Sequence, residues 1–377
     1  MKICIYSGSF DPVTFGHLDI IKRASSTFDR VIVGVGVNSS KKYTFSVKQR
    51  IQFLKNNIKQ SNVEVLSFDG LLADFAYENN ARTIIKGVRN NQDFDYERLL
   101  HEITITQQSG IDTHILVADQ KLSHVSSSAA KELCKFQGLI HEYVPYDVKE
   151  ALEWVLNEQF IVGVTGEIGM GKSCFSHFSR KDMNVDLDGV AHEIYESKSP
   201  VHCELKDRII NDFKLKKDFN KKELGEIVFN DTDKLNHLNN LMRIPILTMT
   251  RKKMMGVKGL ILLNGALLVE SDYLSLCNNN VILVKTTKEK QLAHLQERKL
   301  SNDQIKRRIA SQLNTDAKHK IIIEEIKKHN NGFCIVIDIF DVNADSYSPY
   351  SYTTIRNVDT VLAEVTNGLR HQFQTNP

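Results

Sequence analysis

Two stretches of this chain carry residues whose types and spacing could bind phosphate groups. The first has the pattern Gly-x-x-x-x-Gly-Lys-Ser, from Gly166 to Ser173, directly after an apolar run at residues 161–165. In such a loop the glycines let several backbone N–H groups face one anion, the lysine reaches the β- and γ-phosphates, and the serine hydroxyl holds Mg²⁺. A helix-like stretch at residues 174–178 would add the positive end of its dipole. The pattern therefore predicts a P-loop for a nucleoside triphosphate near the middle of the chain.

The second stretch lies close to the N-terminus and contains Thr14-x-Gly16-His17 after a short apolar run and Gly8. Gly8 permits a tight turn, and Gly16 lets the backbone approach a ligand closely. We expect His17 to open a helix at residues 17–24, where the helix dipole favours phosphate and the imidazole can donate to a phosphate oxygen. The spacing matches a signature shared by nucleotidyltransferases and class I aminoacyl-tRNA synthetases. It predicts chemistry at a nucleotide α-phosphate.

The elements that must position the second stretch alternate between strand and helix patterns. Strand-like runs occur at residues 3–6, 31–37, 63–67, 83–86 and 114–118, with amphipathic stretches between them. This alternation predicts an α/β fold with a mainly parallel, doubly wound sheet. Ligands bind such sheets at the carboxyl ends of the strands, so the polar residues that follow each strand are the candidates for a site.

Composition sets broad limits on the chain. Its 377 residues suggest two or three domains, and a hydrophobic content of 41% with 25% charged residues is typical of soluble globular proteins. A net charge of +3 is too small to indicate nucleic-acid binding. We find no apolar run long enough for a membrane helix and no signal peptide. The six scattered cysteines contain no C-x-x-C pair, which favours reduced thiols, a cytoplasmic protein and no cysteine metal site.

Five sequence blocks in the first part of the chain resemble bacterial phosphopantetheine adenylyltransferase. Taken singly, each has a plainer explanation: Lys41 and Lys42 could be a solvated pair, Arg89 a surface residue and Ser126 a helix N-cap. Their joint order favours the resemblance, which covers nearly all of residues 1–158. The blocks lie at residues 8–17, 40–42, 85–89, 93–97 and 125–128.

The resemblance implies roles for individual residues. His17 would stabilise the pentacoordinate α-phosphate, Lys41 would bind phosphate and Arg89 would clamp the ATP phosphates. Pantetheine would contact Ser9, Lys41, Leu72 and Lys86. Ser9 and Lys86 stand where the family usually has Thr and Arg, and lysine lacks the two-pronged donor set of arginine. ATP would also contact Ser9, Phe10, His17, Gly87, Val88, Arg89, Glu97, Leu122, Ser123, His124, Val125, Ser126, Ser127 and Ser128.

Residues 146–160 predict one amphipathic helix that joins the two parts closely, without a Gly-, Ser- or Pro-rich linker. We therefore expect one domain at residues 1–158 and a second at residues 159–377. In the second, Asp186 and Asp188 are expected to project from a strand end. Two carboxylates there suit a general base or Mg²⁺, and an N-cap role is equally reasonable for one of them.

The second part of the chain resembles dephospho-CoA kinase. The resemblance is carried by the P-loop, Asp-x-Asp-x-x-Ala from Asp186, a Leu-Gly-x-Ile-Val-Phe stretch at 224–229 before a helix, Leu-Leu-Val-Glu at 267–270, and a basic stretch at 298–308. It implies that Lys172 and Asp188 are catalytic, with Asp188 as the base for a ribose 3′-hydroxyl, and that Arg308 or a neighbour is the lid arginine. ATP would contact Gly169, Met170, Gly171, Lys172, Ser173 and Cys174, with Ser173 on Mg²⁺.

Several positions depart from the kinase pattern. The usual histidine before Pro245 is missing, Ala266 replaces a usual proline, and the charge of Glu167 is expected to be mildly unfavourable near ATP. The adenine contact lies either after a strand at residues 333–340, in residues 341–343, or at residues 330–332. We favour the former, because residues 358–373 then form a closing helix and residues 345–354 an inserted loop.

Together these features predict a nucleotidyltransferase Rossmann-like domain followed by a P-loop kinase domain with a helical lid and substrate region. The predicted function is the last two steps of coenzyme A synthesis, with MgATP, 4′-phosphopantetheine and dephospho-CoA as ligands. Neither nucleic acid nor a membrane is expected as a partner, and a homo-oligomer could form through the first domain. An alternative keeps the first activity but makes the second domain a degenerate, regulatory nucleotide- or CoA-binding module. Lys172, Ser173 and Asp188 argue against this alternative, and the missing histidine argues for it.

Overall fold

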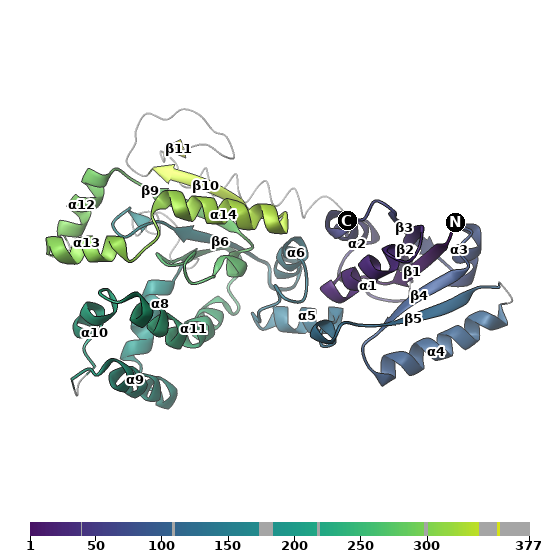
Figure 1. Ribbon diagram of the computed structural model, residues 1–377, viewed down its shortest axis with the longest axis horizontal. Coiled ribbons are helices and arrows are strands. Elements are labelled where there is room, and N and C mark those ends of the chain that lie inside the picture. Colours follow the sequence, from purple (N-terminus) through teal and green to yellow (C-terminus); the bar gives the residue numbers. More distant parts are fainter. Residues whose placement is uncertain are drawn as a thin grey trace. The chain divides into compact units, whose positions relative to one another are not determined.

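The chain folds into two compact units, Met1–Leu156 and Asn157–Pro377, in a computed structural model (Figure 1). The structure describes residues 1–38, 40–107, 110–172, 184–216, 219–297, 301–338 and 353–354. Within these ranges no helix combines the length and the apolar character needed to cross a membrane. Each unit has its own sheet and its own buried core.

The first unit is built on a five-stranded sheet with the order β3-β2-β1-β4-β5, in which every pair is parallel. The chain winds outward from β1 in one direction and then returns to the other side of it. The switch point therefore lies beside β1, where α/β sheets bind ligands. The strands are β1 (Ile3–Gly8), β2 (Arg30–Val37), β3 (Val63–Asp69), β4 (Thr83–Val88) and β5 (Asp112–Val117).

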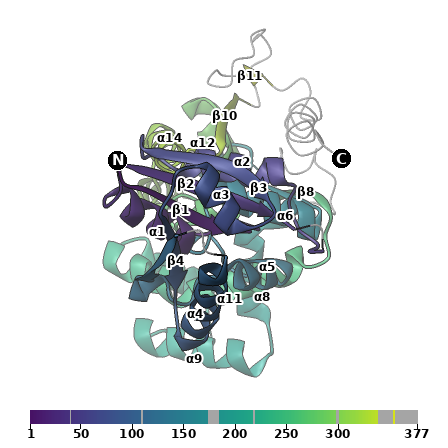
Figure 2. The same ribbon diagram turned by 90° about the vertical axis from the view of Figure 1, so that its right-hand side faces the viewer.

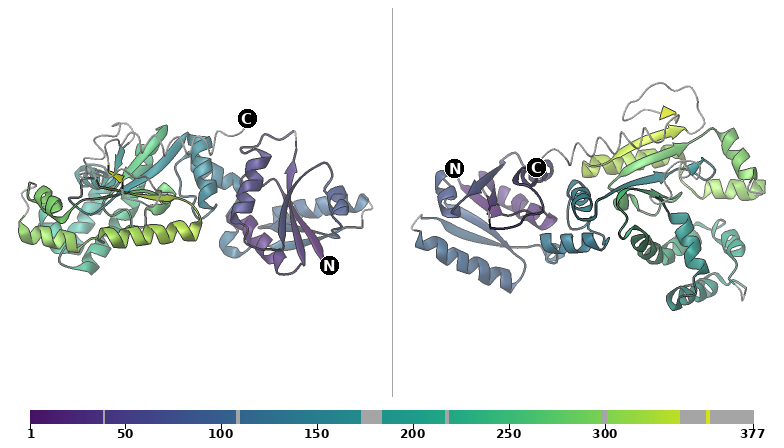
Figure 3. Two further views of the ribbon diagram at one scale, coloured as in Figure 1. Left: turned by 90° about the horizontal axis from the view of Figure 1, so that it is seen from above. Right: turned by 180° about the vertical axis from the view of Figure 1, so that it is seen from behind.

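Helices cover both faces of this sheet (Figure 3). One face packs Ile5, Ile32 and Ile84 against Phe75 and Ala76 of α3. Side-chain caps start several of the helices, and α1 and α2 each begin with a complete capping box. The helices are α1 (Phe15–Ser25), α2 (Val47–Asn57), α3 (Leu72–Glu78), α4 (Asn91–Thr106), η1 (Gln120–Leu122), α5 (Ser127–Lys135) and α6 (Tyr146–Asn157).

The second unit is built on a six-stranded parallel sheet with the order β11-β10-β9-β6-β8-β7. Every residue of the central strand β6 is buried, as expected for a parallel strand covered on both faces. The strands are β6 (Gln159–Thr165), β7 (Asn184–Asp186), β8 (Gly259–Asn264), β9 (Asn280–Lys285), β10 (Phe333–Asp338) and β11 (Thr353–Thr354).

Helices α8 to α11 pack together as a layer of their own beside this sheet (Figure 1), and Figure 2 shows α8, α9 and α11 from another side. The longest, α11, contains Pro245 and carries Arg251, Lys252 and Lys253 in its last turn, where basic residues complement the helix dipole. The helices are α8 (Leu187–Glu196), α9 (Pro200–Phe213), α10 (Lys221–Val228), α11 (Thr232–Met254), η3 (Leu274–Cys277), α12 (Lys288–Glu297), α13 (Asn302–Ala310) and α14 (Thr315–His329).

The predicted α/β class is confirmed, and several boundaries differ. The helix expected at 146–160 ends at Asn157, because Gln159 already belongs to β6 and donates to the carbonyls of Met254 and Val257. Residues 224–229 were expected to precede a helix, and they do precede α11, although residues 224–228 themselves belong to α10. Part of the loop expected at 345–354 is a short strand, in which Thr353 and Thr354 pair with β10. The closing helix expected at 358–373 lies outside the described residues.

Candidate active sites

A pocket of about 370 Å³ opens beside the carboxyl end of β1, at the switch point of the first sheet. The N-termini of α1 and α5 both reach it, so two helix dipoles favour an anion there. The Ser126 hydroxyl caps α5, and the Ser127 hydroxyl donates to the Pro12 carbonyl at 2.7 Å. The wall includes these predicted residues: His17, Gly87, Arg89, Glu97, Leu122, Val125, Ser126, Ser127 and Ser128.

His17 is held in one tautomer by the residue that starts its helix. The Thr14 backbone N–H donates to His17 Nδ1 at 3.1 Å, while the Thr14 hydroxyl accepts from the backbone N–H of His17. A nitrogen that accepts a hydrogen bond from a backbone amide carries no proton, so the neutral ring has its proton on Nε2. His17 lies inside helix α1, which begins at Phe15, and does not open it. Because Nδ1 accepts from Thr14, the Nε2–H of the His17 ring is available to a ligand in the pocket.

The pKa of His17 is lowered to about 4, first by burial and then by the charge of Arg89. The folded protein thus binds fewer protons than the unfolded chain between pH 6.5 and 4. Stability falls as the pH drops through this window, by at most about 3 kcal/mol. At neutral pH the ring is a neutral hydrogen-bond donor and does not need to lose a charge during reaction.

We predict that the His17 ring titrates with a midpoint near 4, which NMR of the imidazole carbon-bound protons measures in the free protein. A His17→Gln variant assigns the resonance. A His17 midpoint near 6.5 contradicts the prediction.

Arg89 is oriented by an acidic neighbour that the motif search did not single out. Its Nε and Nη2 donate to the two carboxylate oxygens of Asp93, at 2.8 and 3.1 Å, and its Nη1 reaches the Val125 carbonyl at 3.3 Å. These hydrogen bonds lower the pKa of Asp93. The i, i+4 spacing of the two residues on adjoining elements was the available sequence signal. A two-pronged contact of this kind holds the guanidinium at the pocket wall.

A buried charge cluster supports the loop that follows β1. Asp11 accepts from the backbone N–H groups of Thr44 and Phe45 at 2.9 Å, and from Lys131 Nζ at 3.2 Å. Arg50 is 1% exposed and donates to the carbonyl of Ser9 at 2.6 Å. Sequence reasoning missed this cluster, because its members are far apart in the chain. It fixes the backbone of the predicted phosphate loop.

A second pocket, of about 200 Å³, lies next to the first along α4 and has a mostly apolar wall. Leu72 and Lys86, both predicted to contact pantetheine, line it. Glu97 lines both pockets, and its carboxylate is 3.1 Å from Lys86 Nζ. One ion pair therefore stands at the boundary between a polar and an apolar pocket.

The other predicted residues of the first site lie around these pockets. Phe10 is buried and packs edge-on against the His17 ring at 5.1 Å. Val88 is buried in β4, and Ser123 and His124 form the turn before α5. Lys41 is exposed in the turn after β2 and is not part of either wall.

The second candidate site begins at the carboxyl end of β6. Gly166 has a φ of +154°, and a Cβ there would sit 2.3 Å from the Val284 carbonyl, so the position requires glycine. Gly169 and Gly171 also have positive φ values. Met170 Sδ accepts from the Thr286 N–H at 3.3 Å, and the Gly169 carbonyl lies 2.9 Å from His294 Nδ1. Ser173 and Cys174 lie outside the described residues.

Lys172 is almost buried and turns back onto its own loop. Its Nζ donates to the carbonyls of Gly166 and Glu167 at 2.8 and 3.0 Å. Asp188 lies in the first turn of α8, and Asp186 caps that helix by accepting from the Asp188 N–H at 3.1 Å. The surrounding protein raises the pKa of Asp188, Lys172 opposes this rise and Asp186 adds to it. The prediction that one of the pair is an N-cap is thus confirmed for Asp186.

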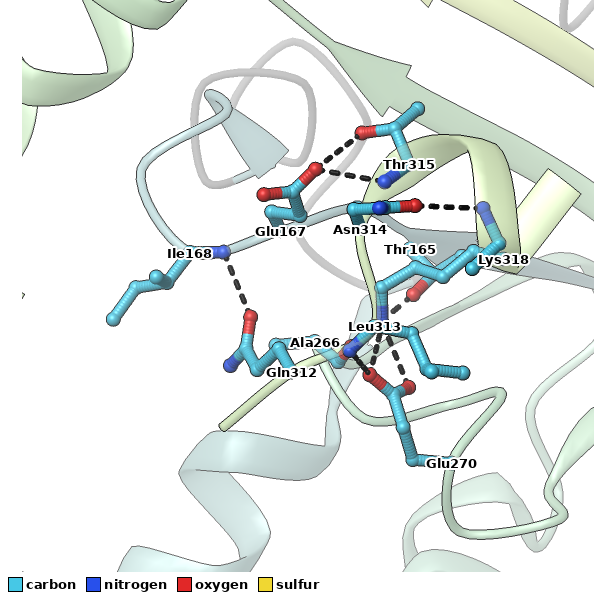
Figure 4. A network of polar contacts seen from close by, with 12 residues as sticks. Thr165, Glu167, Ile168, Ala266, Glu270, Gln312, Leu313, Asn314, Thr315 and Lys318 are labelled. Carbon is cyan, nitrogen blue, oxygen red and sulfur yellow. Dashed lines mark hydrogen bonds and ion pairs between the residues drawn. The ribbon is translucent and has the colours of Figure 1, made fainter. Parts of the chain in front are cut away.

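The structure also bears on the expectations for Glu167, for Arg308 and for the adenine contact. The Glu167 carboxylate was expected to disfavour ATP, but it accepts hydrogen bonds from Thr315 at the start of α14 (Figure 4). The Arg308 guanidinium lies over the Phe229 ring, 5.6 Å from its centre. Residues 330–332 precede β10, and β6 and β10 run parallel in one sheet, so these residues lie at the edge opposite the P-loop. Residues 341–343 lie outside the described residues.

The fold and the two sites define an α/β enzyme with two nucleotide-phosphate sites, a nucleotidyltransferase-type pocket followed by a P-loop. Residues 5–133 match the cytidylyltransferase-like family, and residues 160–331 match the dephospho-CoA kinase family. This chain belongs to the phosphopantetheine adenylyltransferase family through its first unit, as the sequence predicted, and its second unit carries the dephospho-CoA kinase match.

Two relatives show the extent of this similarity. A phosphopantetheine adenylyltransferase of Clostridium perfringens (strain SM101 / Type A) is 41% identical over 168 residues, which cover 44% of this chain and 99% of the relative. One from Caldanaerobacter subterraneus subsp. tengcongensis is 44% identical over 153 residues, covering 40% of this chain and 96% of the relative. The first unit thus corresponds to almost the whole length of these relatives.

Proposed function

We propose that this chain catalyses two consecutive transfers from ATP. The first joins the adenylyl group to 4′-phosphopantetheine, giving dephospho-CoA and pyrophosphate. The second phosphorylates the ribose 3′-hydroxyl of dephospho-CoA, giving coenzyme A and ADP. We assign the reactions to residues 1–158 and 159–377. The observation that carries this proposal is that one chain holds both the His17 pocket and a P-loop with Lys172, so the product of one site is a substrate of the other.

In the first reaction, an oxygen of the pantetheine phosphate attacks the α-phosphorus of ATP. The new P–O bond forms as the bond to the β-phosphate oxygen breaks, and pyrophosphate leaves. His17 Nε2–H and the Arg89 guanidinium stabilise the charge that develops on the phosphoryl oxygens, and the N-termini of α1 and α5 add to this field. Leu72 and the apolar pocket take the pantetheine arm, and Lys86 binds its phosphate.

In the second reaction, Asp188 accepts the proton of the ribose 3′-hydroxyl while that oxygen attacks the γ-phosphorus and ADP leaves. Asp188 is placed for this role by the first turn of α8 and lies within electrostatic reach of Lys172. Lys172 exchanges its two backbone carbonyls for the phosphates, and the backbone amides of Gly169 to Lys172 complete the cradle. Arg308 leaves Phe229 and covers the phosphates.

The residues of the second site fit Mg²⁺, because the carboxylate of Asp186, beside Asp188, supplies oxygen donors of the kind that this ion prefers. Asp186 would hold the ion together with Ser173 and the ATP phosphates, which leaves Asp188 as the base. When bound, the ion neutralises negative charge on the phosphate oxygens. We also propose that the protein works in the cytoplasm, since the buried Cys4 and Cys334 form no disulfide within the described part of the chain.

A coupled assay tests the proposal directly. The protein is incubated with 4′-phosphopantetheine and MgATP, and the products are analysed by mass spectrometry. We expect coenzyme A to form, with dephospho-CoA as an intermediate. Accumulation of dephospho-CoA without coenzyme A would overturn the bifunctional assignment and leave the degenerate kinase-like domain as the explanation. Adding purified dephospho-CoA with MgATP tests the second step alone.

We further propose that the chain forms a homo-oligomer through α4. This helix has no buried residue, and Tyr96, Leu99 and Ile103 recur on one face with exposed fractions of 50–59%. Leu99 lies outside both pocket walls, whereas Tyr96 and Ile103 also line the polar and the apolar pocket, respectively. An apolar stripe of this kind on an ordered helix favours contact with a partner, and a second copy supplies a matching stripe.

We predict that Leu99→Glu lowers the molar mass measured by size-exclusion chromatography with light scattering, because it places a charge in the apolar contact. Val201→Glu, at a more exposed apolar position on α9, is the control and should leave the mass unchanged. A wild-type protein that elutes as a monomer, or a Leu99→Glu variant with the wild-type mass, contradicts this proposal.

A further inference from the structure

Glu167 places a negative charge inside the P-loop, and the structure gives that charge a specific partner. The residue is 8% exposed, and its Oε1 accepts from the backbone N–H of Thr315 at 2.7 Å and from the Thr315 hydroxyl at 2.8 Å. Thr315 is the first residue of α14, so the carboxylate lies at the positive end of a helix dipole. Figure 4 shows Glu167 turned toward Thr315. The carboxylate therefore has a hydrogen-bonded partner at the start of α14.

The next residue of the P-loop is held by the same segment. Gln312 Oε1 accepts from the Ile168 N–H at 2.9 Å, and Gln291 Nε2 donates to the Ile168 carbonyl at 2.9 Å. Two consecutive residues of the loop are thus fixed from outside by side chains and backbone of other elements. The amides that follow, from Gly169 to Lys172, are the ones that a P-loop offers to phosphate.

The same segment, residues 312–318, also reaches the loop after β8. The Leu313 N–H donates to Glu270 at 3.0 Å, and Lys318, which is fully buried, donates to both oxygens of Glu270 and to the Ala266 carbonyl at 2.8 Å. The Ala266 N–H in turn donates to the carboxylate of Asp188. Residues 312–318 therefore contact both the P-loop and the loop that orients the proposed base.

The position of this segment in the chain adds a third connection. It follows α13 after a single residue, Ser311, and α13 carries Arg308. The proposed lid helix, the P-loop and the base-orienting loop are all joined to residues 312–318 by covalent continuity or by hydrogen bonds (Figure 4). Such a shared support can hold reacting groups in register with one another.

We propose that Glu167 is a positioning residue of the kinase site, which fixes the start of the P-loop against the N-terminus of α14 so that the following amides are set for the ATP phosphates. This inference rests on the proposed kinase function. Glu167 does not touch ATP. It acts through the backbone of the loop, together with Gln312.

The test compares Glu167→Ala with Glu167→Gln in the full-length protein. We expect Glu167→Ala to raise the KM for ATP in the kinase reaction by about 10- to 100-fold, the range spanned by hydrogen bonds to a charged group. The KM for dephospho-CoA should change by less than about two-fold. General unfolding would not raise the KM for ATP while leaving the KM for dephospho-CoA unchanged. Glu167→Gln keeps an acceptor for Thr315 and should restore most of the ATP affinity. Calorimetric binding of ADP gives a readout that does not depend on turnover.

Controls separate the possible outcomes. Glu324→Ala, at an exposed position on α14, should behave as the wild type, and the adenylyltransferase activity of every variant reports that the chain is folded. If Glu167→Ala does not fold, Gln312→Leu removes only the acceptor of the Ile168 N–H and should raise the KM for ATP in the same way. A wild-type protein that makes no coenzyme A refutes the proposed function itself. An active wild type with an unchanged KM for ATP in the variant overturns the positioning role.

Discussion

Replacing His17 with alanine is expected to slow formation of dephospho-CoA strongly, while the same protein still phosphorylates added dephospho-CoA. The expected fall in kcat of the first reaction is about 10²- to 10³-fold, the loss found when one hydrogen-bond donor to a developing oxyanion is removed. The physical reason is the tautomer: Thr14 holds Nδ1, so Nε2 is the nitrogen that donates to the phosphoryl group. The measurement is the rate of pyrophosphate release with 4′-phosphopantetheine and MgATP.

The matched control for His17→Ala is His114→Ala, which changes an exposed histidine of β5 in the same unit. It should leave the rate of pyrophosphate release unchanged. Retention of near wild-type activity in His17→Ala would remove His17 from the mechanism. Loss of the kinase activity in the same variant would instead indicate that the substitution damages the whole chain.

Replacing Lys172 with alanine has the opposite pattern: dephospho-CoA accumulates and no coenzyme A follows. We expect the kinase rate to fall by at least about 10²- to 10³-fold, because a positive charge that stabilises the transferring phosphate is lost from a site shielded from water. Lys172 is 9% exposed, and its Nζ is bonded within 3.0 Å to two carbonyls of its own loop. The measurement is coenzyme A formation from added dephospho-CoA and MgATP.

Two further variants sharpen the Lys172 experiment. Lys172→Arg keeps the charge but brings a larger, planar group into a buried position, and we expect it to be inactive as a kinase as well. Lys252→Ala, on the exposed surface of α11, is the control that should keep both activities. Adenylyltransferase activity must survive in Lys172→Ala. Its loss would contradict the assignment of the two reactions to separate units.

The sequence was sufficient for features whose determinants are local. Alternating strand and helix patterns identified the parallel sheet of the first unit, and the spacing of Thr14, Gly16 and His17 located the first site, which the structure places at a sheet switch point. The glycine pattern from Gly166 located the second, since a positive φ at such positions depends on the residue itself. These signals lie within a few residues of one another, so periodicity and motif spacing can reveal them.

Features that depend on distant partners could not be predicted in this way. Glu167 was judged by its charge alone, whereas its effect is decided by Thr315, which lies 148 positions further along the chain. Arg50 supports the Ser9 carbonyl across 41 positions, and nothing in the local pattern marks it. Lys41 is the opposite case: the motif match predicted it as a site residue, but it does not belong to the wall of either pocket. Burial and charge pairing of such residues are properties of the tertiary structure.

The ion pair between Lys86 and Glu97 has a consequence for how the first unit meets its two ligands. Glu97 belongs to the walls of both pockets, so a ligand that draws Lys86 away from it changes the electrostatic free energy of the neighbouring pocket. Binding free energies are linked reciprocally, so each ligand alters the affinity for the other by the same factor, whichever binds first. A ligand that displaces Lys86 from Glu97 is therefore expected to change the affinity of the other pocket for its own ligand.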